Sequence, residues 1–167
     1  MPWHSLNKFS ICRVVFYDNP GARLWSTFPF GRFHDDHSPG RTSYWCFSIE
    51  SAWREVLAHN PDADPTKFVV LQADLETKEL LALTESDARM AFGVTREELV
   101  ASRYQQTQEL GAKIRARGIA ALITYSYADQ PDGRCLVVFE ECLAKSKSKL
   151  AIRGTVPLLE ALPELKE

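Results

Sequence analysis

The sequence lacks the features that would place the chain across a membrane or along a nucleic acid. No apolar run approaches the roughly 18 residues that a membrane-spanning helix requires. The N-terminal stretch MPWHSLNKFS has no basic segment followed by an apolar one, so a signal peptide is not expected. Neither sign of charge dominates, because 20 basic side chains balance 22 acidic ones and the net charge is −2. We therefore expect a cytoplasmic protein that binds neither membranes nor nucleic acids directly.

Cysteine is scarce, and its spacing offers neither a zinc-binding nor a redox motif. The four residues are Cys12, Cys46, Cys135 and Cys142, and no two of them form a CxxC pair. Three of them lie in apolar, strand-like runs. Because disulfides are rare in the cytosol, we expect buried, reduced thiols.

What the sequence does contain is a series of strand-like and helix-like segments. Stretches rich in β-branched and aromatic residues predict strands at 9–17, 42–48, 67–75, 78–84, 119–127 and 135–143. The fourth is expected to pair with the third as a hairpin. Strands that do not alternate strictly with helices predict an α+β fold with an antiparallel or mixed sheet. We expect one domain over 1–167, with its core at about 9–143 and a linker and tail at 144–167.

Three helices are predicted from their capping signals. The expected N-caps are Ser48, Thr84 and Thr95, the last two with an acidic residue three positions further on. The first helix should end at Asn60-Pro61, and the third, a longer one, should end near Gly118.

The segment between the first two predicted strands is long and irregular, which is often a sign of function. It contains the stretch GRFHDDHSPGR, with adjacent potential metal ligands at His34, Asp35, Asp36 and His37. Adjacent side chains of an extended chain point to opposite faces, so these four cannot all bind one ion, and no metal is expected. The stretch is then either a solvated polar loop or the rim of an anion site.

The anion-site interpretation depends on Arg32. Its guanidinium offers a planar set of donors suited to a phosphate, and Gly31 allows a close approach of the backbone. Phe30 and Phe33 offer ring faces on which a ligand could stack. Tyr44 lies on the strand that follows.

Glu55 is the candidate acid. It lies among Trp53, Val56 and Leu57 on the predicted helix, where a carboxylate is either a partly buried ion-pair partner or a functional group. Arg54 points elsewhere on that helix and is a poor partner for Glu55.

Two blocks of the sequence resemble the RES-domain family. The first, GRF…SYWCFSIESAWREVLAH, is similar to that family's GRW…Y…A..Ev..H block. The second, GIAALITYSYADQPDGRCLVVFE, resembles a looser segment of the family, and FVVLQADL with ELLAL resembles its middle pair of strands. The resemblance extends over roughly Ile11 to Phe139.

The resemblance implies a fold, an activity and partners. The fold would be a split α+β core like that of ADP-ribosyltransferases, with NAD+ as the substrate and no metal. The activity would be that of a growth-arresting toxin that cleaves the nicotinamide–ribose bond of NAD+ by hydrolysis or phosphorolysis. The alternatives are a mono-ADP-ribosyltransferase that modifies a protein or nucleic acid, and an inactive NAD-binding module. An Xre-type antitoxin or an immunity protein would be the partner, and both a homo-oligomer and delivery as a secreted effector are compatible with it.

The same resemblance assigns roles to residues. Glu55 would stabilise the oxocarbenium-like state, Tyr44 would contact the nicotinamide or the ribose, and Arg32, together with Arg13, would bind the pyrophosphate. Aligned without a gap on Tyr125, the serine of the family's second block falls on Tyr127, and Ser126 lies one residue earlier. Either Ser126 fills the position after a one-residue shift, or Tyr127 replaces the serine there.

These roles leave the two histidines of the loop without one. His34 and His37 are expected at the tip of a loop at the mouth of the cleft, where they could respond to pH. Their replacement by alanine should cost little activity, whereas Arg32→Ala should remove most of it.

Overall fold

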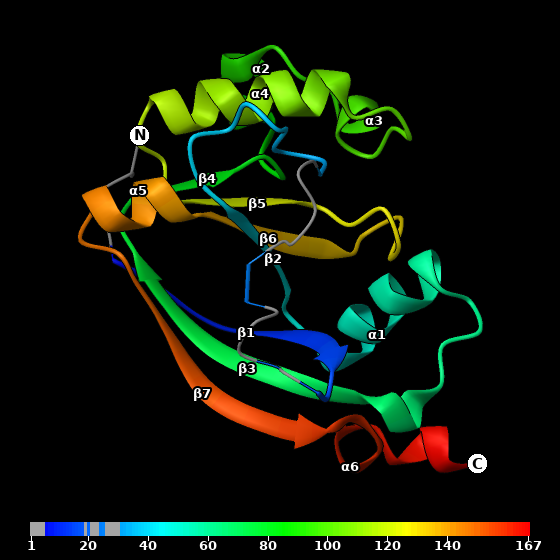
Figure 1. Ribbon diagram of the computed structural model, residues 1–167. Helices are drawn as coiled ribbons and strands as arrows, with labels where there is room; N and C mark the ends of the chain where they lie inside the picture. Colours follow the sequence, from blue (N-terminus) through cyan, green and yellow to red (C-terminus); the bar gives the residue numbers. More distant parts are fainter. Residues whose placement is uncertain (1–5, 19, 21–23, 26–30) are drawn as a thin grey trace.

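The computed structural model describes residues 6–18, 20, 24–25 and 31–167 (Figure 1). The strands are β1 (Asn7–Phe16), β2 (Thr42–Cys46), β3 (Phe68–Thr77), β4 (Leu80–Ala82), β5 (Ala121–Tyr125), β6 (Arg134–Phe139) and β7 (Lys149–Pro157). The α-helices are α1 (Ile49–His59), α2 (Ser86–Phe92), α3 (Arg96–Leu99), α4 (Gln105–Ala116), α5 (Glu140–Lys145) and α6 (Leu158–Ala161). Two short 3-10 helices lie at Pro65–Lys67 and Pro163–Lys166.

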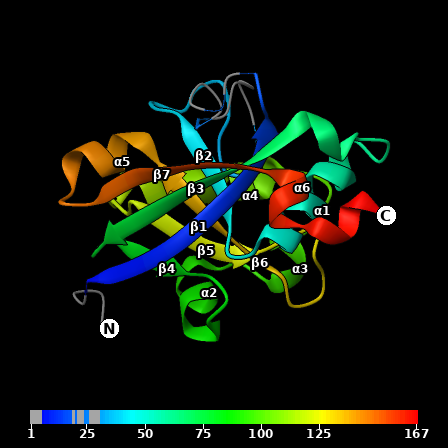
Figure 2. The ribbon, with the colours of Figure 1, turned by 90° about the horizontal axis from the view of Figure 1, so that it is seen from below.

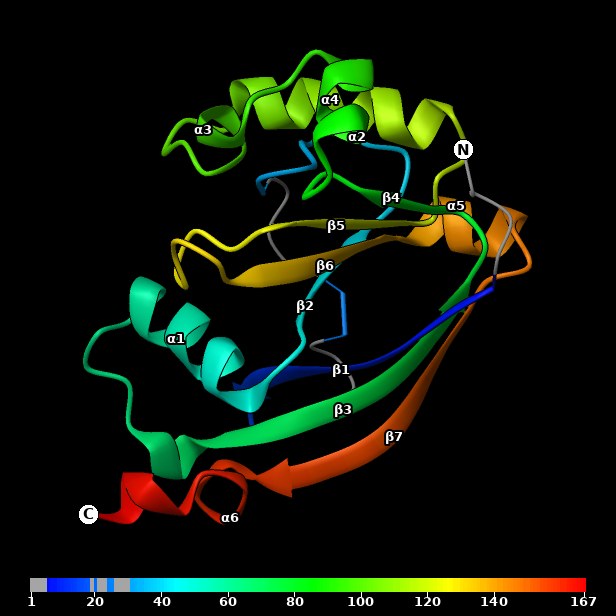
Figure 3. The ribbon, with the colours of Figure 1, turned by 180° about the vertical axis from the view of Figure 1, so that it is seen from behind.

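In the described part of the chain, seven strands form one mixed sheet in the order β4-β5-β6-β2-β1-β3-β7. All neighbours are antiparallel except β4 and β5, which are parallel. The sheet is split, because β2 pairs with β6 along its whole length but meets β1 only at Cys12 and Cys46. Figures 1 and 3 show the two halves diverging on either side of β2. The predicted α+β fold with a split mixed sheet is confirmed.

One hydrophobic cluster lies on each half of the sheet, and a third cluster joins the two halves. Helices α2, α3 and α4 pack their apolar residues on β4, β5 and β6. Helix α1 packs Ala52 and Trp53 on β1 and β3, next to Leu158 of α6. On the opposite face of β1, Ile11 and Val15 pack with Trp45 of β2. Figure 2 shows α1 and α6 side by side at one end of β1 and β3.

Local signals located the best-capped helices, although not always their lengths. Ser48 caps α1 and accepts a hydrogen bond from the Ser51 amide, as predicted. The Thr95–Glu98 capping box is also present, but α3 ends at Leu99 and α4 starts afresh at Gln105, so the single long helix is wrong. The Thr84 cap is wrong too, because α2 begins after Glu85 without a side-chain cap.

Three predictions about the strands and the C-terminal segment are wrong. The expected hairpin of β3 with β4 does not form: β3 already pairs with β1 and β7 on its two edges, so β4 pairs with β5. The predicted linker and tail instead supply β7 and α6. Strand β7 follows β3 along most of its length, with a bulge beside Gly154, whose φ of +149° suits glycine. The predicted last strand ends at Phe139, and its second half is α5.

The cysteines are free thiols, as expected; three are buried and Cys135 is half-buried. In the residues that the structure describes, no helix is long and apolar enough to cross a membrane.

Candidate active site

A tight turn, Gly31 to His34, carries Arg32 against helix α4. The Gly31 amide donates to the His34 carbonyl at 2.8 Å, which closes the turn. From α4, the Gln108 side-chain amide donates to the carbonyls of Gly31 and His34 at 3.0 and 3.2 Å. A Cβ at Gly111 would collide with the Phe33 carbonyl, so glycine at this helical position allows the turn to approach α4.

Arg32 is held in a defined orientation by backbone and rings. Its Nη1 donates to the carbonyls of Ala101 and Leu99 at 2.6 and 3.3 Å. The guanidinium lies over the Tyr104 ring at 4.6 Å and over the Tyr127 ring at 5.5 Å. Its other nitrogens have no hydrogen bond to the described residues, so they can donate to an anionic ligand.

Glu55 and Ser126 form a direct pair. Ser126 is 2% exposed, and its hydroxyl donates to Glu55 Oε1 at 2.6 Å. The same hydroxyl oxygen accepts from the Asp129 amide at 3.0 Å. An amide can only donate, so the hydroxyl proton is directed to Oε1 of Glu55, which accepts it. The pair thus holds the Glu55 carboxyl group in a half-buried position.

Asp129 ties the turn that follows β5 to α1. Its carboxylate accepts from the Ser51 hydroxyl and from the Arg54 guanidinium, both at 2.5 Å. Hydrogen bonds from Ser51 and then Arg54 hold the pKa of Asp129 below its ordinary value. Arg54 therefore pairs with Asp129, and Glu55 is left to Ser126.

The Tyr44 hydroxyl is placed by the same turn that carries Arg32. It accepts from the Phe33 amide at 3.1 Å and lies 2.9 Å from Nδ1 of His34. Burial raises the pKa of Tyr44 well above its ordinary value, and the opposing effects of the Phe33 amide and of the Arg115 and Arg32 charges are smaller. The hydroxyl therefore stays neutral over the physiological range of pH.

Cys135 connects the two halves of this arrangement electrostatically. Burial raises the pKa of its thiol to about 12; the charge of Glu55 raises it further and that of Arg32 lowers it. Glu55 and Arg32 therefore both lie close enough to the Cys135 thiol for their charges to act on it. We define the candidate active site as Arg32, Tyr44, Glu55, Ser126 and Tyr127, which come from four separate segments of the chain.

Comparison with known proteins places this chain in a family. The RES domain matches residues 10–158. The chain belongs to the RES-domain family. The fold of this RES domain resembles that of the MbcT toxin in the crystal structure of the M. tuberculosis MbcT–MbcA toxin–antitoxin complex. The TM-score is 0.71 and the sequence identity 20%, over 96% of this chain and 90% of that chain. No curated protein matches the sequence.

The structure of this RES domain explains why the serine position was ambiguous in the sequence. Strand β5 ends at Tyr125, so Ser126 and Tyr127 both lie in the turn, where the alternation of a strand no longer holds. Ser126 turns inward to Glu55, while Tyr127 is 51% exposed and lies under the Arg32 guanidinium. Both residues contact the site.

Two predicted ligand-binding residues lie elsewhere in the RES domain. Phe33 is fully buried in the cluster that covers β4, β5 and β6, so the expected stacking of its ring on a ligand is wrong. Arg13 donates to the Leu24 carbonyl at 2.6 Å and to the Ser43 hydroxyl at 3.4 Å, and burial lowers its pKa to about 10. It does not join the contacts of the candidate site. Phe30 lies outside the described residues.

The HDDH stretch of this RES domain separates into unlike residues. His34 is 5% exposed and contacts Tyr44, so its expected place at a loop tip is wrong. Asp35 accepts from the His37 amide and the Ser38 hydroxyl and so stabilises the loop. Asp36 and His37 are exposed, and Nε2 of His37 lies 3.6 Å from Oδ1 of Asp36. No group of three potential metal ligands is found in the part of the chain that the structure describes.

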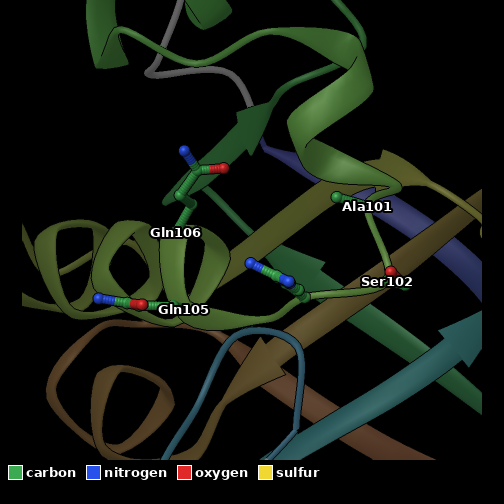
Figure 4. Close-up of a pocket in the computed structure, with 5 residues that line it drawn as sticks. Ala101, Ser102, Gln105 and Gln106 are labelled. Carbon is green, nitrogen blue, oxygen red and sulfur yellow. The ribbon is translucent and has the colours of Figure 1, made fainter.

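A surface hollow of about 440 Å³ lies next to Arg32's carbonyl partners, at the start of α4 (Figure 4). It is lined by Ala101, Ser102, Arg103, Gln105 and Gln106. Neither Glu55 nor Ser126 lines it. The candidate site of the RES domain is therefore defined by its hydrogen bonds and charges and not by this hollow.

Sequence reasoning missed the residues that hold the site in place. Gln108, Gly111 and Asp129 act through contacts with residues far away in the sequence. A glycine within a helix was the one local signal among them, because glycine there is unfavourable without a packing reason.

Proposed function

We propose that this RES domain is a toxin that degrades NAD+ by cleaving the bond between nicotinamide and ribose. The observation that carries the proposal is the hydrogen bond of 2.6 Å between Ser126 and Glu55, which holds the carboxyl group next to the residue, Tyr127, whose ring lies under Arg32. Glycosidic bonds break through an oxocarbenium-like state with positive charge on the sugar. A carboxylate fixed near the ribose stabilises that charge as it develops.

The chemistry needs few groups from the protein. Nicotinamide carries a positive charge in NAD+ and takes the bonding electron pair as it leaves, so it departs neutral and needs no general acid. Water or phosphate then bonds to the ribose carbon, and the proton of an attacking water passes to the carboxylate or to solvent. Glu55 would stabilise the cation and orient the nucleophile.

Arg32 and the hydroxyls account for binding. The guanidinium nitrogens of Arg32 that have no hydrogen bond to the described residues suit the pyrophosphate, which is the negatively charged part of NAD+. Tyr44 and Ser126 would hydrogen-bond the nicotinamide riboside end, and the exposed ring of Tyr127 offers a stacking face. None of these steps requires a metal.

The likeness to MbcT supports the toxin part of the proposal, since MbcT is solved in complex with its antitoxin MbcA. By analogy, we propose that an antitoxin or immunity protein binds this chain and blocks the candidate site. Co-expression with the partner should then restore the growth of cells that produce the domain.

The direct test follows both halves of NAD+ in the presence of the purified chain. Nicotinamide release with ADP-ribose as the product would show hydrolysis, and a phosphate-dependent ADP-ribose phosphate would show phosphorolysis. Adenylate label retained on a macromolecule would instead indicate a transferase. NAD+ binding without any release by the folded wild-type chain would contradict the proposal and indicate a binding module.

A further inference from the structure

His34 lies against the Tyr44 hydroxyl because the turn at Gly31 folds its ring inward. A Cβ at Gly31 would lie 2.5 Å from His34 Cε1 and 2.8 Å from the Tyr44 hydroxyl oxygen. Both distances are far too short for a side chain, so glycine is required for this contact. The ring is 5% exposed and its Nδ1 is 2.9 Å from the hydroxyl oxygen of Tyr44.

The hydrogen bonds of the Tyr44 hydroxyl can be assigned by elimination. The Phe33 amide can only donate, and it occupies one lone pair of the oxygen at 3.1 Å. Among the described residues, the acceptor within hydrogen-bond distance of the phenolic proton is Nδ1 of His34. A partly buried polar proton is normally paired, so the phenol donates to Nδ1, and Nδ1 carries no proton.

We propose that His34 is a positioning residue that fixes the hydrogen-bonding direction of Tyr44. With the phenolic proton held by Nδ1, the Tyr44 oxygen can only accept from a ligand. It therefore selects a donor group, a ribose hydroxyl or a carboxamide N–H. The substrate chemistry in this inference rests on the proposed function, whereas the His34–Tyr44 hydrogen bond does not.

Three substitutions of His34 distinguish the hydrogen-bond acceptor at Nδ1 from the volume of the side chain. Asparagine can present an oxygen where Nδ1 lies, glutamine presents one nearer the position of Nε2, and leucine presents none. We expect His34→Leu and His34→Gln to lower kcat/KM for nicotinamide release about tenfold to a hundredfold, and His34→Asn to stay within about threefold of wild type. His37→Gln, in the same loop but exposed, should match wild type.

A double-mutant cycle with Tyr44→Phe tests whether His34 acts through Tyr44. With the hydroxyl removed, His34→Leu should cause no further loss. An equal loss from His34→Leu in both backgrounds, or rescue by glutamine and not by asparagine, would overturn the proposal.

An NMR measurement tests the hydrogen bond without any enzymatic assay. Long-range ¹H–¹⁵N spectra of the folded chain should show His34 Nδ1 unprotonated at neutral pH, with a shift in its ¹⁵N resonance in Tyr44→Phe. A proton on Nδ1 would overturn the inference. If Nδ1 is unprotonated and yet the wild-type chain leaves NAD+ intact, the proposed function fails and the role of His34 toward Tyr44 stands.

Discussion

At the scale of single residues, the decisive feature is a carboxylate whose partner is a hydroxyl and not a cation. Glu55 was recognisable in the sequence as an acid in an apolar stretch, but its partner was not. Arg54, its neighbour in the chain, is taken up by Asp129, and this leaves Glu55 to Ser126. Among the described residues, no arginine forms an ion pair with Glu55, which agrees with the proposed role of this carboxylate toward the ribose cation.

Ser126→Ala tests the importance of that partner. The loss of the 2.6 Å hydrogen bond should leave Glu55 free to rotate and lower kcat/KM for nicotinamide release about tenfold or more. Stability, followed by urea unfolding, should fall by about 1–2 kcal/mol. Ser86→Ala, at an exposed serine, is the control. Unchanged kinetics in Ser126→Ala would show that Ser126 does not contribute to the activity of the site.

At the scale of elements, the site depends on how two segments are fastened to helices. The Gly31–His34 turn is fastened to α4 through Gln108, and the Ser126–Gly133 turn to α1 through Asp129. Neither contact has a signature in the local sequence, because each joins residues more than 70 positions apart. This is why the sequence can suggest candidate site residues but does not indicate the residues that support them.

Gly111→Ala tests the fastening of the first turn. Helix propensity alone would stabilise the variant by about 1 kcal/mol. The new Cβ would collide with the Phe33 carbonyl, and overpacking of this kind costs about 1–3 kcal/mol. We therefore expect a net loss of stability and a fall in kcat/KM as Arg32 shifts. A variant more stable than wild type would show that the turn can move away freely.

The contacts of Asp129 with helix α1 should make the stability of the domain depend on pH. Its pKa is lowered in the folded chain, so its contribution to stability is present above the unfolded pKa of about 3.9 and is lost as the pH falls through the lower, folded value. Asp129→Asn should therefore destabilise the domain near pH 7 and differ less from wild type near pH 3. Urea midpoints at both pH values test this, with the exposed Asp62→Asn as the control. A difference that stays constant with pH would contradict it.

At the scale of the whole molecule, the fold is a split sheet completed by its last strand. The sequence predicted the α+β class and most strands, because those depend on local patterns of apolar residues. It failed at β4 and β7, whose places depend on which edges of β3 and β5 are open. The basic, serine-rich segment at 145–149 looked like a linker, although the chain continues from it into β7.

Truncation after Ser148 tests the place of β7. The shortened chain would lose β7, would expose the edge of β3, and would leave the cluster around α1 without Leu158 and Leu162. We expect it to be unfolded by circular dichroism and to aggregate, whereas a chain ending at Leu162 should fold. A folded protein of residues 1–148 would show that residues 149–167 are a tail that the fold does not need.

The proposed role of Glu55 is best tested by the rate of nicotinamide release from saturating NAD+, compared among the wild-type chain, Glu55→Gln and Glu50→Gln. Both glutamates lie on α1, but Glu50 is exposed in its first turn. Turnover is expected from wild type and Glu50→Gln, and a loss of about a hundredfold or more from Glu55→Gln. Equal rates for the two variants, with both folded, would contradict it.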